Sequence, residues 1–380
     1  MEYKKLGDIA TYINGYPFKP EDRGECGLPI IRIQDLTGNT YDLGYYDGKY
    51  PERIEINNGD ILISWSASLG VYVWNRGKAL LNQHIFKVVF DKVEINKRYF
   101  VYAVQFKLKE MEAKTHGATM KHIVKKDFDS TLIPYPSLKE QSRIAETIDS
   151  IAKSINMRQK QLQKLDELVK ARFVELFGDP KLNDKGWNAG IVSDYYEVKG
   201  GKRIPKGMGY ADGVTAHPYL RATDMKNETI LDDDIHYIDE EVYALIKRYT
   251  VKNGDVYLTN VGVNLGMAGV IPEKYDGANL TENAVKLVPK TEKVIDGVFL
   301  AHYINSPGIQ DYINERKMSV GVPKLAIFRI ETMPLLLPPM DIQMQFIEFC
   351  KQTDKSKAII QKALNKVQLL FDSLMQNYFG

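Results

Sequence analysis

The sequence has few cysteines and no long apolar run. Its two cysteines, Cys26 and Cys350, lie far apart and fit no metal-ligand spacing, which excludes a disulfide-stapled fold and indicates no zinc site. The most apolar short run, MPLLLPPM at residues 333–340, is broken by prolines and is much shorter than a membrane span. The first residues, MEYKKLGDIA, lack the apolar core of a signal peptide. We therefore expect a cytoplasmic protein with no membrane segment.

An excess of one charge is also missing. The chain has 51 Lys and Arg against 49 Asp and Glu, a formal net charge of +2, so it lacks the overall basic character of a small nucleic-acid-binding domain. Any basic surface must therefore be local. With 380 residues, 44% of them hydrophobic, the chain has an ordinary globular composition and is long enough for two or three domains.

The usual catalytic motifs are absent as well. The sequence contains no G-x-x-x-x-G-K-[ST] phosphate loop, no G-x-S-x-G elbow and no H-E-x-x-H pair. No proline directly precedes an aspartate, so the Pro-Asp start that is common in restriction-type nuclease sites is missing. Pro338-Pro339 lacks the polar residue expected before it in an adenine methyltransferase loop. His84 lies in a strand-like run, where a structural role is favoured over catalysis. The sequence thus predicts no catalytic centre and no metal site.

The sequence repeats itself at about half its length. Four segments of the first half recur in the same order in the second half: LPIIRIQDL (28–36) with HPYLRATDM (217–225), NNGDILIS (57–64) with KNGDVYLT (252–259), LNQHIFKVV (81–89) with LTENAVKLV (280–288), and TLIPYPSLKEQSRIAE (131–146) with MPLLLPPMDIQMQFIE (333–348). This order indicates a duplication of the form A-B-A-B. Within the first pair, Arg32 and Arg221 each precede an acid by three residues. A structural ion pair or a loop anchor is favoured for these arginines, and DNA contact is the alternative.

Each repeat consists of a β-rich domain and a long helix. Strand-like runs separated by turn signals predict a β-rich domain with some helix, whereas residues 138–177 contain no Pro or Gly. Ser137 and Glu140 form a capping-box pattern, so we expect one helix about 60 Å long. The fold class is α+β, with two β-rich domains that are each followed by a long helix. The expected bounds are 1–136, 137–180, 181–337 and 338–380.

Both long helices carry an apolar heptad seam, obtained by alternate steps of four and three residues. The apolar seam positions are Ile144, Ile148, Ile151, Ile155, Leu162, Leu165, Val169 and Leu176, and in the second helix Ile360, Leu364, Val367, Phe371 and Leu374. A single amphipathic helix on a core is the alternative, but two matched seams favour a helix pair. Polar positions interrupt the seam and either fix the register or face a partner: Arg158, Arg172, Thr353 and Lys357.

Local basic or base-reading stretches are candidates for nucleic-acid contact. Residues 199–207, KGGKRIPKG, form a Gly-rich basic loop suited to a phosphate backbone, and residues 114–126 are also basic. The matching loop of the first half, TYINGYPFK at 11–19, carries groups that stack on or hydrogen-bond to bases. The candidates are Tyr12, Asn14, Tyr16, Lys19, Lys114, Lys121, His122, Lys199, Lys202, Arg203 and Lys206. A solvated loop is the alternative interpretation of each stretch.

Over essentially all 380 residues the chain resembles the specificity subunit of a type I restriction and modification system. The resemblance rests on the duplicated order of domain and helix, on the repeated pairs quoted above, and on the helix start PYPSLKEQSRIAETI. In the second copy Ile342 stands where the first has Glu140, which weakens the capping box there.

The resemblance implies two target-recognition domains held apart by two antiparallel helices that pair as a coiled coil. Each domain would read one half of a split double-stranded DNA site. The subunit would have no activity and bind no cofactor of its own. Its partners would be two methyltransferase subunits, which bind S-adenosylmethionine and methylate adenine, and restriction subunits that use ATP and magnesium.

Three other interpretations stay open at the level of the sequence. A non-catalytic scaffold would use the helices to assemble proteins and the domains to bind peptides, and the near-neutral net charge suits it. A related assembly outside type I could use a similar specificity subunit. An enzyme with its own nuclease or methyltransferase activity is disfavoured by the missing motifs.

Overall fold

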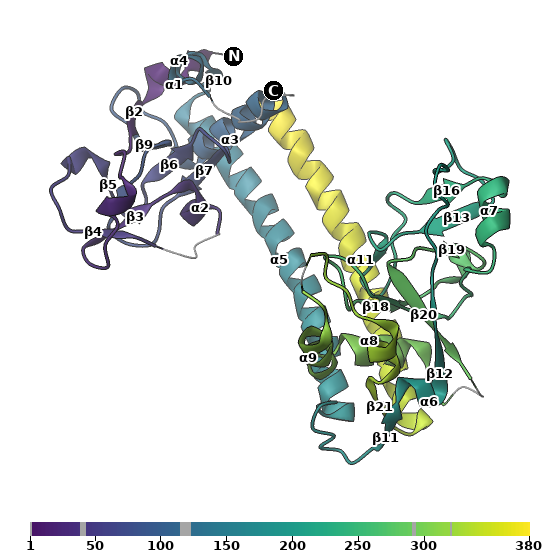
Figure 1. Ribbon diagram of the computed structural model, residues 1–380. Helices are drawn as coiled ribbons and strands as arrows, with labels where there is room; N and C mark the ends of the chain where they lie inside the picture. The colour runs from purple at the N-terminus through teal and green to yellow at the C-terminus, as the bar shows by residue number, and fades with distance from the viewer. Residues whose placement is uncertain (1, 39–42, 115–122, 291–293, 320) are drawn as a thin grey trace. The chain divides into compact units, whose positions relative to one another are not determined.

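The computed structural model describes residues 2–38, 43–114, 123–290, 294–319 and 321–380 (Figure 1). The chain divides into two compact units. Unit 1 contains Met1–Lys160 and Gln361–Gly380, and unit 2 contains Gln161–Ile360. Each unit therefore combines one β-rich domain with a part of each of two long helices, α5 (Leu138–Phe177) and α11 (Met340–Phe379). This arrangement confirms the α+β fold class expected from the sequence.

Unit 1 is built on two four-stranded sheets. The first is antiparallel throughout, in the order β2 (Thr11–Asn14), β9 (Ile85–Val89), β6 (Ile61–Ser64), β7 (Gly70–Val73). The second has the order β4 (Tyr45–Tyr46), β3 (Leu28–Ile31), β8 (Ala79–Leu81), β5 (Glu55–Ile56). A short pair, β1 (Tyr3–Lys5) with β10 (Leu132–Pro134), joins the two ends of the domain. Its main helices are α3 (Lys97–Lys114) and α4 (Lys125–Ser130).

Four short helical turns complete unit 1: α1 (Leu6–Ile9), α2 (Ile33–Leu36), η1 (Pro20–Asp22) and η2 (Glu52–Ile54).

Unit 2 repeats the first sheet as β12 (Tyr196–Gly200), β20 (Ala284–Pro289), β17 (Val256–Thr259), β18 (Ala268–Val270). Its second sheet has the order β16 (His236–Ile238), β13 (His217–Leu220), β19 (Asn279–Leu280).

Two short strand pairs also belong to unit 2: β11 (Asn188–Ile191) with β21 (Pro334–Leu337), and β14 (Met225–Lys226) with β15 (Thr229–Ile230). Its helices are α6 (Val192–Tyr195), α7 (Glu240–Ile246), η3 (Glu273–Tyr275), α8 (Gly297–Asn305), α9 (Pro307–Arg316) and α10 (Ile327–Glu331). The order β12-β20-β17-β18 matches β2-β9-β6-β7 strand for strand, so the duplication in the sequence is a duplication of the fold.

The repeated Arg-x-x-Asp turn has the structural role expected from its sequence. In unit 1 Arg32 and Asp35 form an ion pair at 3.3 Å, and in unit 2 Arg221 and Asp224 form one at 2.7 Å. Each aspartate is buried and also accepts a hydrogen bond from the backbone amide of its arginine at 2.8 Å. The arginine binds both carboxylate oxygens of Asp224, whereas in unit 1 the backbone amide and the guanidinium of Arg32 both bind Oδ2 of Asp35. The buried Oδ1 of Asp35 has no hydrogen-bond partner among the described residues.

The start of α5 has half of the expected capping box. The hydroxyl of Ser137 accepts a hydrogen bond from the Glu140 amide at 3.3 Å. The Glu140 carboxylate instead accepts from the Arg143 guanidinium at 2.6 and 2.9 Å. The second hydrogen bond of a capping box, from the Ser137 backbone amide to the Glu140 carboxylate, was therefore wrongly expected. An arginine one turn further along competes for this carboxylate. The helix ends before Gly178, whose φ of +75° suits the left-handed position after a helix.

A buried glutamine fixes each domain to the start of its long helix. The side-chain amide of Gln141 accepts from the Asn96 backbone amide and donates to the Pro136 carbonyl, both at 2.9 Å. Gln343 makes the same bonds to Asp296 and Pro338 at 2.9 and 2.8 Å. Both glutamines are fully buried. The start of each long helix is thus tied by hydrogen bonds to the loop before α3 or α8.

The two long helices pack against each other with opposite directions in both units. In unit 1, Ile144 and Ile148 near the start of α5 share a core with Met375 and Phe379 at the end of α11. In unit 2, Phe173 near the end of α5 packs on Phe346 near the start of α11, with ring centroids 5.5 Å apart. The helices therefore pair antiparallel.

The structure places every apolar seam position at a protected site. Ile144, Ile148 and Val169 are buried, and the other ten seam residues are half-buried. The polar interruptions differ in role. Thr353 bonds back to the Phe349 carbonyl of its own helix at 2.9 Å, whereas Lys357 of α11 forms an ion pair with Asp166 of α5 at 2.6 Å. Of these two, Lys357 is the residue that can help to fix register.

Candidate nucleic-acid interface

Four loops of unit 2 meet at one end of the β12-β20-β17-β18 sheet, where β12 and β17 end and β20 and β18 begin. The Lys202 amide donates to the Leu280 carbonyl at 2.8 Å, and the Asn260 amide donates to Asn283 at 3.0 Å. The Leu325 amide in turn donates to Asn260 at 2.8 Å. We call the loops 200–206, 260–267 and 281–283, with residues 317–319 and 321–325, the loop surface of unit 2.

Unit 1 has a corresponding loop surface, which we define by residues 14–19, 65–69, 82–84 and Ile123. The Tyr16 amide donates to the Leu81 carbonyl at 2.8 Å, as Lys202 does to Leu280. The Trp65 amide donates to His84 at 3.2 Å, and the Ile123 amide donates to Trp65 at 3.0 Å. The two surfaces therefore share one hydrogen-bonding scheme.

A glycine aligns the first loop of both surfaces. A Cβ on Gly15 would lie 2.1 Å from the Asn82 carbonyl oxygen, and one on Gly201 would lie 2.0 Å from the Thr281 carbonyl oxygen. Only glycine allows this approach of two backbones. The next residue is Tyr16 in unit 1 and Lys202 in unit 2, so equivalent backbone positions present an aromatic ring and a cation. The two loops offer different chemistry on the same scaffold.

Three of the contact residues expected in unit 1 are exposed. Tyr16 is 37% exposed and packs against Phe18, with ring centroids 5.0 Å apart. Asn14 and Lys19 are exposed too, and the Asn14 side-chain oxygen accepts from the Trp65 indole at 3.3 Å. These three residues lie on the loop surface, or at its edge, where a ligand can reach them.

Tyr12 is a correction to the expected contact set. Its side chain is 5% exposed, its ring packs edge-on to Phe128 at 4.9 Å, and its hydroxyl donates to the Leu6 carbonyl at 2.9 Å. Burial raises the pKa of this hydroxyl far above its usual value. Tyr12 is a core residue that cannot stack on a base, because helix α4 covers the ring.

Most of the basic stretch 114–126 lies outside the residues that the structure describes. Lys114 is the last residue of α3, and the candidates Lys121 and His122 lie outside the described residues. The stretch resumes at Ile123, which is bound to Trp65.

The basic candidates of unit 2 have acidic neighbours that the linear sequence does not reveal. Arg203 forms an ion pair with Glu282 at 2.5 Å, and Lys199 forms one with Glu197 at 2.9 Å. Burial opposes ionisation of Glu282, yet its hydrogen bond to Arg203 brings the pKa below its usual value. Lys202 and Lys206 are exposed, and within the described ranges no ion pair involves either of them. These two lysines carry the unbalanced charge of the stretch.

An apolar tip on the loop surface of unit 2 was missed by the sequence reasoning. Val263 is 97% exposed, Val322 66% and Met318 61%. The loops that carry them are joined by a hydrogen bond from the Gly262 amide to the Pro323 carbonyl at 2.9 Å. Exposed valines on anchored loops suit contact with an apolar group of a ligand, such as the methyl group of thymine.

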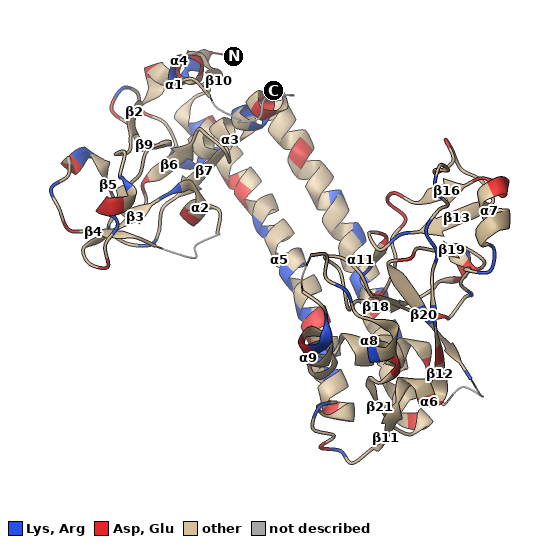
Figure 2. Ribbon diagram, in the orientation of Figure 1, with Lys and Arg blue, Asp and Glu red and all other residues tan. Residues whose placement is uncertain are grey.

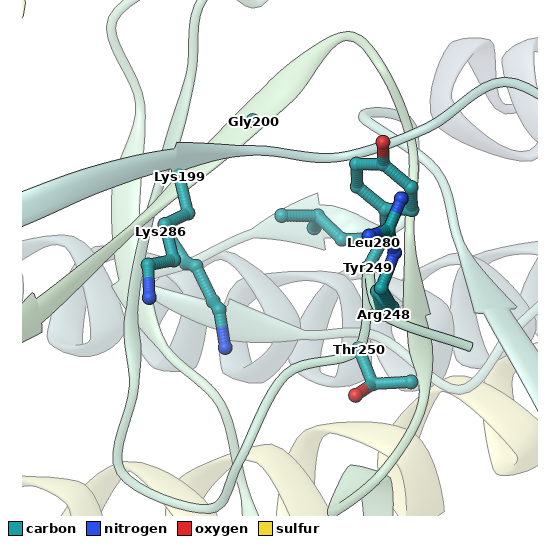
Figure 3. A pocket seen from close by; sticks show the side chains of 7 residues that line it. All are labelled: Lys199, Gly200, Arg248, Tyr249, Thr250, Leu280 and Lys286. Atoms are coloured by element: carbon teal, nitrogen blue, oxygen red, sulfur yellow. The ribbon is translucent and has the colours of Figure 1, made fainter. Parts of the chain in front are cut away.

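A basic pocket lies beside the same loop surface. It has a volume of about 250 Å³ and is lined by Lys199, Gly200, Arg248, Tyr249, Thr250, Leu280 and Lys286. Figure 3 shows the Lys199 and Lys286 side chains pointing in the same direction, across from Arg248 and Tyr249. The Lys202 ammonium lies 5.8 Å from the centre of the Tyr249 ring. The pocket is thus contiguous with the first loop of the surface.

Charges elsewhere are mixed. Figure 2 shows Lys and Arg interspersed with Asp and Glu within each unit, as the near-neutral composition requires. In the described part of the chain, no three His, Cys, Asp or Glu side chains are grouped so that they could hold a metal ion. No helix within that part is long and apolar enough to cross a membrane.

The fold and the loop surfaces define a duplicated recognition protein, with two similar domains on a pair of long helices. Comparison with known proteins agrees with this class. The family model "Type I restriction modification DNA specificity domain" matches residues 1–167 and 184–369. The chain therefore belongs to the family of type I restriction-modification specificity subunits.

Individual relatives cover almost the whole chain. The EcoBI specificity subunit of Escherichia coli is 24% identical, over 98% of this chain and 84% of its own length. The MjaVIII specificity subunit of Methanocaldococcus jannaschii is 21% identical, over 97% of this chain and 91% of its own length. The solved S subunit from M. genitalium has a TM-score of 0.54 at 15% identity and covers 100% of this chain and 96% of its own. A chain from a structural study of complex assembly in the type I restriction-modification system has a TM-score of 0.59 at 14% identity. The match covers 100% of this chain and 97% of that chain. These two structures share the fold.

Proposed function

We propose that each unit of this chain reads one half of a bipartite double-stranded DNA site through its loop surface. The observation that carries the proposal is that one hydrogen-bonding scheme occurs twice with different side chains, Tyr16 in one copy and Lys202 in the other. A common scaffold with variable loops is what the reading of two different half-sites requires.

The loop surfaces hold both kinds of group that sequence-specific DNA binding needs. In unit 2, Lys202 and Lys206 supply cations for phosphate contacts, and Val263 supplies an apolar contact for a base edge. In unit 1, Asn14 and Tyr16 supply hydrogen-bonding and stacking groups. Both units would approach DNA with the sheet end that carries the loop surface.

The long helices would bind the partner subunits. Apolar side chains lie exposed on the faces away from the seam, namely Met157, Leu168, Val174, Ile359, Leu369 and Leu370. Two methyltransferase subunits would dock on these faces, in keeping with the duplicated fold. Restriction subunits would join them in the cytoplasm. Adenine methylation with S-adenosylmethionine, and DNA cleavage with ATP and magnesium, would belong to those partners, and this chain would have no catalytic role.

The test is to express this chain with the methyltransferase subunit of its own system and to map methylated adenines across the host DNA by single-molecule sequencing. The proposal predicts a split motif with a fixed gap. A stable complex with an active methyltransferase subunit that yields no methylated motif would contradict it and favour a scaffold.

A further inference from the structure

The basic pocket of unit 2 places two like charges directly opposite each other. Lys199 of β12 is the register partner of Lys286 in the antiparallel strand β20. Directly opposed side chains in such a pair lie about 5 Å apart at Cβ, and like charges there are destabilising. Without acidic neighbours, this pair would be unfavourable for folding.

The acids around the pocket offset only part of its charge. Glu197 pairs with Lys199 at 2.9 Å, and Asp255 pairs with Lys286 at 3.1 Å. The third cation, Arg248, is exposed and belongs to no ion pair among the residues that the structure describes. None of the seven lining residues is acidic. Such a pocket suits a phosphate group.

The first copy of the fold lacks this combination. Its strand β2 places Ile13, and not a lysine, opposite Lys87 of β9. Aligned on the Asn-Gly-Asp turns, Glu55 occupies the place of Thr250 and forms an ion pair with Lys78 at 2.8 Å. In unit 1 the lysine opposite Lys87 is thus replaced by an apolar side chain, and the place of Thr250 is taken by a carboxylate whose charge Lys78 balances.

One ion pair occurs in both units and shows that the basic pocket of unit 2 and the corresponding region of unit 1 are equivalent positions in the fold. Lys87 forms an ion pair with Asp60 at 3.2 Å, just as Lys286 does with Asp255 at 3.1 Å. The strands and turns are therefore the same in both units, and the difference lies in the side chains added around this lysine. The basic pocket is a feature of unit 2.

We propose that the basic pocket of unit 2 binds one phosphodiester group of the DNA backbone beside the second half-site, and that unit 1 has no matching contact. The pocket adjoins the loop surface through Lys202 and Tyr249, so a strand read by the loops passes close to it. This inference rests on the proposed DNA-reading function. Its consequence is that the two domains hold the DNA backbone unequally.

The test compares two variants in the assembled methyltransferase complex. The first combines Lys199→Ile, which copies the side chain of unit 1, with Arg248→Ala. The second is the matched control Arg53→Ala, at the place in unit 1 that is equivalent to Arg248. Binding to DNA with the mapped motif is measured over a range of salt concentrations. In Lys199→Ile combined with Arg248→Ala, the slope of log K against log salt should fall by about 0.9. The affinity should fall roughly five- to tenfold at about 0.1 M salt. The control should retain both.

Neutral methylphosphonate linkages, placed one at a time along the DNA, locate the contact. One position beside the second half-site should weaken binding of the wild-type complex and have no further effect in the double variant. An unchanged slope, or the same sensitive positions in both complexes, would overturn the inference. If inorganic phosphate raises the Tm of the wild-type complex but not of the double variant, while the salt slope for DNA is unchanged, the pocket serves a free anion and the DNA contact is wrong. Failure of the wild-type complex to bind any specific DNA would instead contradict the proposed function.

Discussion

The side-chain oxygen of Gln141 accepts a hydrogen bond from the backbone amide of Asn96 at 2.9 Å. Gln343 and Asp296 repeat this bond at the same length in unit 2. Each pair joins the first turn of a long helix to the loop that leads into a domain helix, α3 or α8. A domain held in this way keeps a defined place on its end of the helix.

The first prediction follows from the burial of these amides. Gln141→Ala leaves the Asn96 amide and the Pro136 carbonyl without their partner, and the free energy of unfolding should fall by about 1–3 kcal/mol for each buried group left unsatisfied. Denaturant unfolding of the chain measures it. Glu146→Ala, at an exposed position of the same helix, is the control and should change stability by less than about 0.5 kcal/mol. Equal effects of the two substitutions would contradict the assigned role.

The second prediction concerns the spacing of the two half-sites. Deletion of one heptad from each helix, residues 151–157 and 364–370, shortens the helix pair by about 10 Å at 1.5 Å per residue. With about 3.4 Å per base pair, the accepted gap should shorten by about three base pairs. Mapping of methylated adenines in cells that express the deletion variant measures the gap.

A control for this experiment keeps the length and changes the sequence. Asn156→Ala replaces an exposed residue of the same segment, one that is not among the apolar residues proposed to bind the methyltransferase subunits, and should leave the gap unchanged. Retention of the original gap by the deletion variant, at full affinity, would show that the helices do not set the spacing.

The third prediction separates two neighbouring cations. Lys202→Ala should weaken binding to DNA with the correct second half-site and lower the salt slope by about 0.9, because one phosphate contact is lost. Replacement of Arg203 and Glu282 together by glutamine removes a pair with no net charge, so the slope should stay the same. Lys252→Ala, an exposed lysine at the opposite end of the same sheet, is the control. A larger loss of slope in the paired variant than in Lys202→Ala would contradict this division of roles.

The fourth prediction concerns base reading by the apolar tip. Val263→Asn should alter the preference for thymine at one position of the second half-site, by about 1–3 kcal/mol of discrimination. Because Val263 is 97% exposed, stability should change by less than about 0.5 kcal/mol. Binding to a panel of DNAs with each position of the half-site substituted measures the preference. The control Val214→Asn, 82% exposed and outside the loop surface, should leave the panel unchanged, and an unchanged panel for Val263→Asn would remove this loop from base reading.

Local patterns predicted much of the fold. The absence of Pro and Gly from residues 138–177 gave a helix of the observed length, and the Arg-x-x-Asp spacing gave the ion pair between Arg221 and Asp224. These features depend on neighbours within a few residues. The duplication was visible for the same reason, since each repeated segment is short and ordered.

The rest depended on contacts between distant segments. Tyr12 looked available in its strand, but Phe128 covers its ring from a helix more than a hundred residues away. Arg203 looked like a free cation, but Glu282, 79 residues further on, forms an ion pair with it. The basic pocket required the strand register that places Lys199 opposite Lys286. No local pattern reports such pairings, because they arise only when the sheet forms.

The most direct test of two independent reading domains is an exchange of residues 1–136 for the matching domain of another specificity subunit. The methylated motif of the hybrid is then mapped across the host DNA. Our account predicts that one half of the split motif changes while the other half and the gap are retained. A change in both halves, or in neither, would contradict the assignment of one half-site to each unit.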